Sequence, residues 1–350
     1  MAVDRYRPLM TAGNDAHTDG PGPLIERIFA FMETTALMTA AKIGLPDALA
    51  GGPLTPAEVA ARINVDEQAV GRLLRDLTGT GVFATDGPGS YGLGKLGHFL
   101  CSDVPGSARA FYQMFGGPLG QGMIGGEASL LKPGTTAFEQ VLGAPIFEYM
   151  AEHPTDGTIF NSAMVSIGCA IGTPPIHAYD FSGLSQIVDV GGGHGQLARE
   201  VLRANPGMKG IVYDRPNVIG ETQVEIERDG LADRCQAIAG DFFESVPAGA
   251  DCYALRLVIH DWDDDEAVTI LRRCREGITG EGRLLIFEIV MPDSDAPHPA
   301  KGMDWVMLSC VTGQERTEDE YADLLERAGF RLKRVVPSPT PMSVVEAVPV

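Results

Sequence analysis

The segment VDVGGGHG, residues 188–195, sets a cluster of glycines between an apolar run and a helical pattern. Asp189 precedes the cluster, to which Gly191 and Gly193 belong. Glycines permit positive φ angles and let a ligand come close to the backbone, so the segment is a candidate binding loop. The same pattern is also typical of a tight strand-to-helix turn without a ligand. The residues that follow the other apolar runs distinguish a binding loop from a turn without a ligand.

Acidic residues follow the next two apolar runs, where a parallel sheet would bring them to the same edge. Asp214 stands nineteen residues after Gly195, a spacing that suits hydrogen bonds from ribose hydroxyls. Asp241 and Phe242 follow the third run, and a carboxylate beside an aromatic ring suits the amine and the face of an adenine. A nicotinamide dinucleotide would instead need the glycines to hold a pyrophosphate. The acids favour S-adenosylmethionine (SAM), whose amino-acid tail the glycine loop would hold.

A histidine and an aspartate, His260 and Asp261, end the fourth run in the segment RLVIHDW. A neutral imidazole can accept a proton from a hydroxyl near neutral pH, and the end of a buried strand would hold it rigidly. Methyl transfer from a sulfonium to oxygen needs such an acceptor and an in-line arrangement of the reacting groups. Arg256, four residues earlier, and Glu288, at the end of the fifth run, are expected to converge on the same place.

Alternating strands and helices must position these residues. Between helical patterns, apolar runs predict five strands, over residues 186–190, 210–213, 235–239, 252–259 and 283–289. This alternation predicts an α/β fold with a doubly wound parallel sheet. After a last helix, the runs RLKRVV and SVVEAV predict two further strands that close the sheet.

The chain is predicted to divide into three parts. Residues 1–21 are polar and are expected to be a flexible N-terminus. Residues 22–180 are expected to form a mostly helical domain for dimerisation and substrate capping, and residues 181–350 a SAM-binding catalytic domain. An apolar stripe at helical spacing over 24–49 suits contact with another subunit as well as an ordinary buried helix pair.

A winged-helix pattern occupies part of the helical half. Thr55 and Asp66 are predicted to cap two helices, and residues 81–91 to form a short hairpin. A DNA reader needs a basic face, but acids outnumber basic residues over 53–97. A structural or dimerisation role is therefore favoured over DNA binding.

Composition limits the partners further. The 350 residues carry 27 Lys and Arg against 47 Asp and Glu, a net charge of −20 that disfavours nucleic acid and anionic membrane. The six cysteines form no CxxC pair, which favours reduced thiols over disulfides or a zinc site. No signal peptide is recognised, and no stretch is expected to reach the roughly 18 apolar residues of a membrane span. These features predict a cytoplasmic protein.

The motifs together resemble a known family. VDVGGGHG, GDFFE, HDWDDDEAVTILRRC, GRLLIFEIVMP and GQERTEDEYADLLERAGF follow one another as in SAM-dependent small-molecule O-methyltransferases of the acetylserotonin, caffeate and hydroxyneurosporene type. The chain is similar to their bacterial natural-product branch, which acts on anthracyclines, polyketides and mitomycins. The resemblance implies a class I SAM-methyltransferase sheet of Rossmann-like topology, a winged-helix dimerisation domain, a homodimer, and an aromatic small molecule as substrate.

The resemblance also implies roles for the polar residues. His260 corresponds to the general base, and Glu288 and Glu315 match the two glutamates that flank it in family members. A carboxylate bonded to Nδ1 would fix the tautomer that leaves Nε2 free. Asp261 could bind a second substrate hydroxyl or the SAM ammonium. Arg256 stands where plant relatives usually have lysine and could hold the SAM carboxylate or nearby backbone.

Two further groups of residues remain. Acids 263–266 could suggest a metal cluster, but they are predicted to cap a helix, so no metal is expected. On the substrate side, five residues match pocket positions of relatives, although plain core packing fits the same pattern: Phe160, Met164, Met303, Asp304 and Met307.

Two alternatives to O-methyl transfer stay open. One is an enzyme that keeps the fold and SAM but hydroxylates or decarboxylates a polyketide. The presence of the His260–Asp261 pair argues against it, because the family members that do so lack the pair. The other is a regulator that uses the winged helix.

Overall fold

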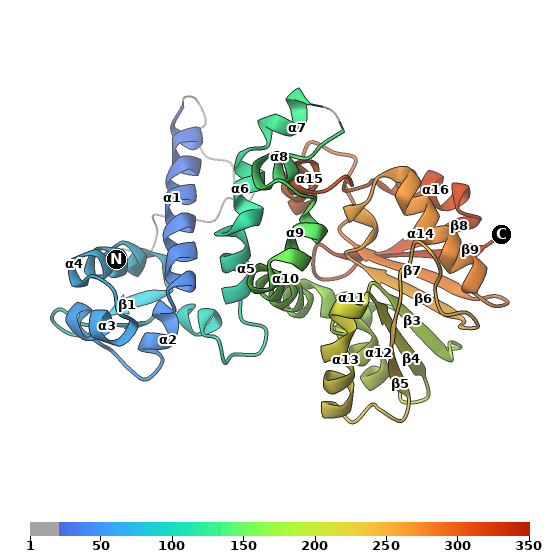
Figure 1. Cartoon of the computed structure of the whole chain (residues 1–350), viewed down its shortest axis with the longest axis horizontal. Helices are drawn as coiled ribbons and strands as arrows, with labels where there is room; N and C mark the ends of the chain where they lie inside the picture. Colours follow the sequence, from blue (N-terminus) through green and yellow to red (C-terminus); the bar gives the residue numbers. More distant parts are fainter. Residues whose placement is uncertain (1–20, 133) are drawn as a thin grey trace. The chain divides into compact units, whose positions relative to one another are not determined.

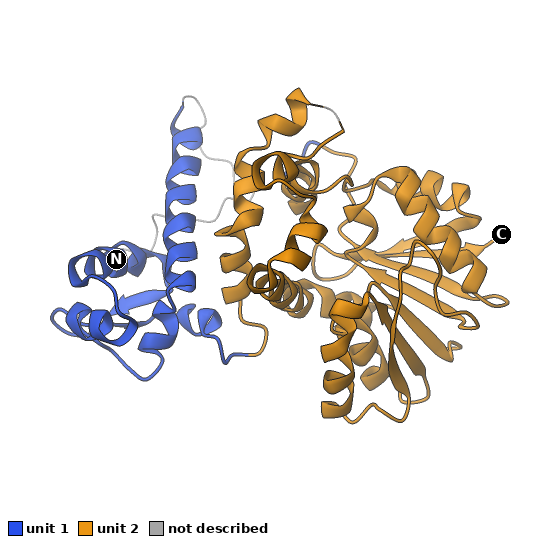
Figure 2. Cartoon of the chain, viewed as in Figure 1, with its two compact units in different colours: residues 1–104, 295–297 blue, residues 105–294, 298–350 orange. Residues whose placement is uncertain are grey.

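The computed structural model describes residues 21–132 and 134–350. The predicted flexible segment 1–21 therefore lies outside the described residues, except for Pro21. The chain forms two compact units: one ends at Val104 and takes in Asp295–Pro297, and the other holds Pro105–Ser294 and His298–Val350 (Figure 2). The predicted boundary near residue 180 instead lies close to the start of the large sheet, whose first strand begins at Gln186.

The first unit begins with α1 (Gly22–Lys42), followed by α2 (Leu45–Leu49), α3 (Pro56–Ile63) and α4 (Glu67–Leu77). Thr55 forms a capping box with Glu58 at the start of α3, and Asp66 accepts a hydrogen bond from the backbone of Ala69 at the start of α4. After the short turn η1 (Thr78–Thr80), strands β1 (Phe83–Thr85) and β2 (Tyr91–Leu93) pair antiparallel, and η2 (Gly97–Leu100) ends the unit. The predicted helix caps and hairpin are confirmed.

The second unit opens with helices that precede its sheet (Figure 1). They are α5 (Arg109–Phe115), α6 (Pro118–Ile124), α7 (Glu127–Leu131), α8 (Ala137–Leu142), α9 (Ile146–Glu152), α10 (Pro154–Ile167), the short π-helix η3 (Gly168–Gly172) and α11 (Thr173–Ala178). The later helix α15 (Pro299–Cys310) packs against α6 and α8, and its Met307 joins their apolar cluster. Chain segments far apart in sequence thus build one helical layer.

The sheet has seven strands in the order β5-β4-β3-β6-β7-β9-β8. The first five in sequence are parallel, and the last two run antiparallel at one edge. Their bounds are β3 (Gln186–Val190), β4 (Lys209–Asp214), β5 (Cys235–Ala239), β6 (Cys252–Arg256), β7 (Arg283–Glu288), β8 (Phe330–Val336) and β9 (Ser343–Pro349). The predicted α/β fold and all seven predicted strands are confirmed.

The fourth strand is shorter than predicted. β6 ends at Arg256, and Leu257 takes a left-handed backbone conformation with φ of 54°, which a non-glycine residue rarely adopts. The chain then forms the turn η4 (Ile259–Asp261). The expectation that His260 ends a strand is therefore wrong, because the backbone leaves the sheet three residues before it.

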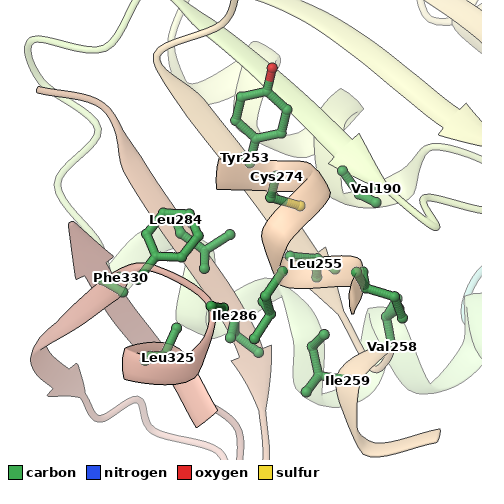
Figure 3. Packing of buried hydrophobic residues seen from close by; sticks show 14 of the residues in the cluster. Val190, Tyr253, Leu255, Val258, Ile259, Cys274, Leu284, Ile286, Leu325 and Phe330 are labelled. Carbon is green, nitrogen blue, oxygen red and sulfur yellow. The ribbon is translucent and has the colours of Figure 1, made fainter. Parts of the chain in front are cut away.

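Helices cover both faces of the sheet. On one face α14 (Asp264–Gly277) and α16 (Glu318–Arg327) pack on β6 and β7, where Tyr253, Leu255, Leu284 and Ile286 are buried (Figure 3). On the other face lie α12 (Gln196–Ala204) and α13 (Pro216–Arg228). Strands buried on both faces carry continuous apolar runs, which is why the sequence predicted them clearly.

One apolar stretch was missed. Pro154–Ala178, 25 residues long, is long and apolar enough by length and composition to cross a membrane, so the expectation of no such stretch is wrong. In the described structure it is divided into α10, η3 and α11, and α10 packs against α5 while α11 packs against α12. Its apolar residues thus serve packing within the second unit.

Candidate active site

A cavity of about 330 Å³ opens in the second unit beyond the carboxyl ends of β3, β4 and β6. The charged residues of its lining lie on its sheet side, called here the polar side, although apolar residues line that side as well. The charged residues include Asp189, Asp214, Asp241, Arg256 and Asp261. Its other side is built by α9 and α10. The lining residues from these two helices are Phe147, Met150, Ala151, Gly157, Phe160, Asn161, Met164 and Val165.

The glycine loop forms the floor of the cavity between β3 and α12. Gly191 and Gly193 have φ of 67° and 55°, in the left-handed region that favours glycine. A Cβ atom on Gly191 would lie 2.9 Å from a methyl group of Val258. The loop is held in place because the backbone N–H of Gly193 donates to Oδ2 of Asp214 at 2.8 Å.

The three predicted cofactor acids line the same cavity. Asp189 is buried, accepts a hydrogen bond from the backbone of Ala198 at 3.1 Å, and has its pKa raised to about 6 by burial. Burial also raises the pKa of Asp214. Asp241 lies next to Phe242 at the rim and accepts a hydrogen bond from the backbone of Phe243 at 2.8 Å. The acids keep oxygen atoms available on the polar side of the cavity.

Arg256 carries a guanidinium that is only partly satisfied. Nη2 donates to Oε1 of Gln196 at 3.0 Å, whereas the buried Nη1 has no hydrogen-bond partner among the described residues. The backbone of η3 lies close by: a Cβ on Gly172 would be 3.0 Å from Nη1, and one on Gly168 would be 3.0 Å from Nη2. Burial lowers the pKa of this guanidinium. A buried donor of this kind calls for an anionic acceptor from a ligand.

His260 is bracketed by two carboxylates. Its Nδ1 lies 2.8 Å from Oε1 of Glu315, and its Nε2 lies 3.6 Å from Oδ1 of Asp261. Burial by itself would lower the pKa of His260, but the carboxylates of Glu315 and Asp261 outweigh it and raise that pKa to about 10. Burial raises the pKa of Asp261 to about 7 and also raises the pKa of Glu315. The three side chains therefore share protons as one coupled group.

Glu288 holds the backbone before His260. Its fully buried Oε1 accepts hydrogen bonds from the backbone N–H groups of Val258, Ile259 and His260 at 3.2, 2.7 and 3.1 Å. Its Oε2 accepts from the hydroxyl of Tyr321. The prediction placed Glu288 beside the imidazole. In the structure it is Glu315 that hydrogen-bonds Nδ1 of the imidazole, whereas Glu288 accepts hydrogen bonds from the backbone of the turn.

His260 lies just behind the surface of the cavity. It is 6% exposed and does not itself line the cavity, whereas its neighbours Asp261 and Trp262 do. The indole of Trp262 stacks on Phe147 of α9, with ring centroids 5.6 Å apart. The guanidinium of Arg215 also lies over the Phe147 ring, 5.6 Å from its centroid. An aromatic wall thus joins the sheet edge to α9.

The predicted substrate residues divide into two groups. Phe160 and Met164 line the cavity, whereas Met303, Asp304 and Met307 do not. Met307 is buried in the helical cluster, with Met303 packed against that cluster, and Asp304 accepts a hydrogen bond from the backbone of Glu315 at 2.9 Å. These three residues fit the alternative of core packing better than that of lining the pocket, because α15 directs them toward other helices and toward the loop that carries Glu315.

The acids after His260 serve the next helix. Asp263 and Glu266 form a capping box at the start of α14, and Asp264 and Asp265 form ion pairs with Arg316 and Arg327 at 2.8 and 2.6 Å. The predicted capping role is confirmed. Within residues 21–132 and 134–350, no group of three or more His, Cys, Asp or Glu side chains is placed to hold a metal ion.

Comparison with known proteins agrees with this geometry. Residues 127–331 match the family described as the O-methyltransferase domain, and residues 25–103 match the O-methyltransferase dimerisation domain. The chain belongs to the SAM-dependent O-methyltransferases. SAM is therefore the cofactor of this O-methyltransferase, and the winged-helix segment falls in the dimerisation domain rather than in a DNA-binding one.

Relatives of this O-methyltransferase cover nearly its whole length. Phenazine O-methyltransferase PhzM of Lysobacter antibioticus is 36% identical over 330 residues, 93% of this chain and 96% of the relative. The structure of the mitomycin 7-O-methyltransferase MmcR has a TM-score of 0.86 at 33% identity, over 94% of this chain and 97% of that one. NcsB1, solved with S-adenosyl-L-homocysteine (SAH) and 1,4-dihydroxy-2-naphthoic acid, has a TM-score of 0.80 at 32% identity, over 96% and 100%.

Sequence reasoning missed two residues that support the site of this O-methyltransferase. Tyr321 donates to Glu288, and the buried Arg316 donates to the carbonyl oxygens of Ile259 and Trp262 at 3.0 and 2.9 Å. The segment GQER, already singled out for Glu315, was the available signal for Arg316, although the burial of this arginine is known only from the structure. Tyr321 lies on a helix at ordinary core spacing and gave no such signal.

Proposed function

We propose that this O-methyltransferase transfers the methyl group of SAM to a phenolic hydroxyl of an aromatic secondary metabolite, with His260 as the general base. The observation that carries the proposal is the 2.8 Å contact between His260 Nδ1 and Glu315, directly behind a cavity with one polar and one apolar side. An apolar wall of methionine and aromatic residues suits a flat ring. The polar side suits the cofactor.

The residues of the polar side fit SAM. Asp214 would accept hydrogen bonds from the ribose hydroxyls, and Asp241 with Phe242 would hold the adenine. Nη1 of Arg256, which has no hydrogen-bond partner within the described part of the chain, supplies a donor for the carboxylate of the amino-acid tail. The glycine loop leaves room for that tail, since a Cβ at Gly191 would already crowd Val258 and Phe242.

The catalytic step depends on the protonation of His260. When bound, SAM supplies a methyl group on a positively charged sulfonium. A positive charge in the cavity lowers the pKa of the nearby imidazole, which is otherwise about 10, and so makes neutral His260 available. Nδ1–H donates a hydrogen bond to Glu315, so the Nε2 lone pair is the one that takes the proton of the acceptor hydroxyl. Glu315 and Asp261 then stabilise the imidazolium.

The working assembly is proposed to be a homodimer. Helix α1 of the first unit exposes a row of large apolar side chains and falls almost entirely within the dimerisation-domain match. These side chains are Leu24, Ile25, Ile28, Phe29, Phe31 and Met32. Sedimentation of the purified chain at twice the monomer mass would support the dimer.

The cytoplasm is proposed as the location, because all six cysteines are free thiols and five of them are buried.

The proposed reaction is tested by incubating the protein with SAM and a panel of naphthols, hydroxybenzoates and hydroxyphenazines. Mass spectrometry should find products one methyl group heavier that carry the methyl on oxygen. The absence of product with every phenol, from protein that binds SAH, would contradict the proposal.

A further inference from the structure

One face of helix α10 forms most of the apolar side of the cavity. Residues 157, 160, 161, 164 and 165 line the cavity, the i, i+3, i+4, i+7, i+8 spacing of a single helical face. Helix α9 adds Phe147, Met150 and Ala151. Among these lining residues of α9 and α10, Asn161 is the one with a polar side chain.

The amide of Asn161 has no hydrogen-bond partner among the described residues, although an amide has two donor hydrogens and an acceptor oxygen. The side chain is half-buried between apolar neighbours. Water can satisfy the amide in the free protein, but a ring that fills this side of the cavity expels that water. A ligand without a polar group at this point leaves the amide unpaired, which is costly.

The position of Asn161 along α10 separates it from the cofactor end. Gly168, at the C-terminal end of the helix, packs against the guanidinium of Arg256. Asn161 lies seven residues earlier, which is about 10 Å along the axis at 1.5 Å per residue. Arg256 is where the cofactor carboxylate is proposed to bind, so Asn161 lies well away from that end of the cofactor.

We propose that Asn161 hydrogen-bonds a second polar substituent of the aromatic acceptor, distinct from the hydroxyl that is methylated. The substrate class is then a flat aromatic with at least two polar ring substituents: one reaches the His260–Asp261 side and the other reaches α10. This assignment rests on the proposed function, since it takes the apolar side of the cavity as the acceptor side.

A matched pair of ligands tests the assignment. 2,7-Dihydroxynaphthalene and 2-naphthol share one ring system and differ by one hydroxyl. We expect the SAH-loaded wild-type protein to bind the diol at least 10-fold more tightly than 2-naphthol. The two equivalent hydroxyls of the diol account for about twofold of this ratio, and the hydrogen bond to Asn161 accounts for the rest. Asn161→Leu keeps the size of the side chain and should reduce the ratio to about twofold, with SAH affinity unchanged.

Asn217→Leu is the matched control, because Asn217 is an amide that lines the same cavity from α13. This variant should keep the wild-type ratio at saturating SAH. If Asn161→Leu fails to bind SAH, Asn161→Ala gives the ratio instead. Three outcomes would overturn the proposal. They are an affinity ratio near twofold in the wild type, a ratio that is unchanged in both Asn161 variants, and no binding of either naphthol.

Binding and turnover separate this inference from the proposed function. If the diol binds through Asn161 but SAM yields no methylated product, the proposed reaction fails and the recognition role stands. If both naphthols are methylated but the variant leaves their binding ratio unchanged, the reaction stands and the role of Asn161 fails.

Discussion

Nδ1 of His260 lies 2.8 Å from Oε1 of Glu315, a residue 55 positions later in the chain. The turn η4 carries the histidine, and the loop before α16 carries the glutamate. Glu315 is itself fixed, because its backbone N–H donates to Asp304 at 2.9 Å. This contact orients the imidazole, and the carboxylate of Glu315 raises its pKa.

Replacing His260 with alanine should remove the proton acceptor. We expect methyl transfer to fall by about 10²- to 10⁴-fold, the range that general-base catalysis contributes. The affinity for SAH, measured by calorimetry, should stay within about twofold, because the cofactor is proposed to be held by Asp214, Asp241 and Arg256. The exposed His177 gives a control, since His177→Ala should change neither quantity. Turnover retained by His260→Ala would show that another group accepts the proton.

The Glu315→Gln variant should shift the pH dependence. With His260 as the proposed general base, the rate should rise with pH as the imidazole loses its proton, and the carboxylate of Glu315 contributes most to raising the pKa of His260. Removing this negative charge lowers that pKa, so the rising limb of the pH–rate profile should move to lower pH. The maximal rate should fall as well, because the imidazolium loses its counterion.

The limb is measured with SAM saturating and the acceptor dilute, and an NMR titration of the His260 ring checks the same pKa directly. A limb that stays in place, or moves to higher pH, would mean that Glu315 does not control the imidazole.

Arg256→Leu should weaken cofactor binding. The buried Nη1 has no partner among the described residues, and a charge-assisted hydrogen bond to a carboxylate contributes about 1.5–3 kcal/mol. We therefore expect the Kd for SAH to rise by about 10- to 100-fold in calorimetric titrations. Arg331→Leu, at an exposed position of β8, should leave the Kd unchanged. Equal Kd values for Arg256→Leu and the wild type would place the SAM carboxylate elsewhere.

Tyr321→Phe should loosen the turn that carries His260. The Tyr321 hydroxyl donates to Glu288, whose carboxylate is fully buried and holds three backbone N–H groups. Leaving this buried carboxyl group with one donor fewer should lower the free energy of unfolding by about 1–3 kcal/mol and reduce kcat, with SAH affinity preserved.

Tyr91→Phe is the matched control, because the Tyr91 hydroxyl has no hydrogen bond to the described residues. Denaturant titration of both variants gives the comparison. Equal stabilities would show that Glu288 is satisfied without Tyr321.

The cofactor side of the site could be predicted from the sequence. The buried strands are recognisable as apolar runs, and the residues just after parallel strands must meet at one edge of the sheet. The grouping of Asp189, Asp214 and Asp241 at that edge therefore follows from the sequence alone. The helix caps at Thr55 and Asp66 were equally readable, because capping is a local interaction within four residues.

The surroundings of His260 were decided by the tertiary structure. Glu288 and Glu315 are the same residue type, 28 and 55 positions after His260, and only the fold places Glu315 against the imidazole and Glu288 against the backbone turn. The left-handed Leu257, which takes His260 off the strand, has no local sequence signal. Met307 and Met164 likewise share a residue type, yet one packs into the helical core and the other lines the cavity. The positions of the strands and the helix caps follow from local patterns, whereas side-chain partners depend on how separate elements pack, which no local pattern encodes.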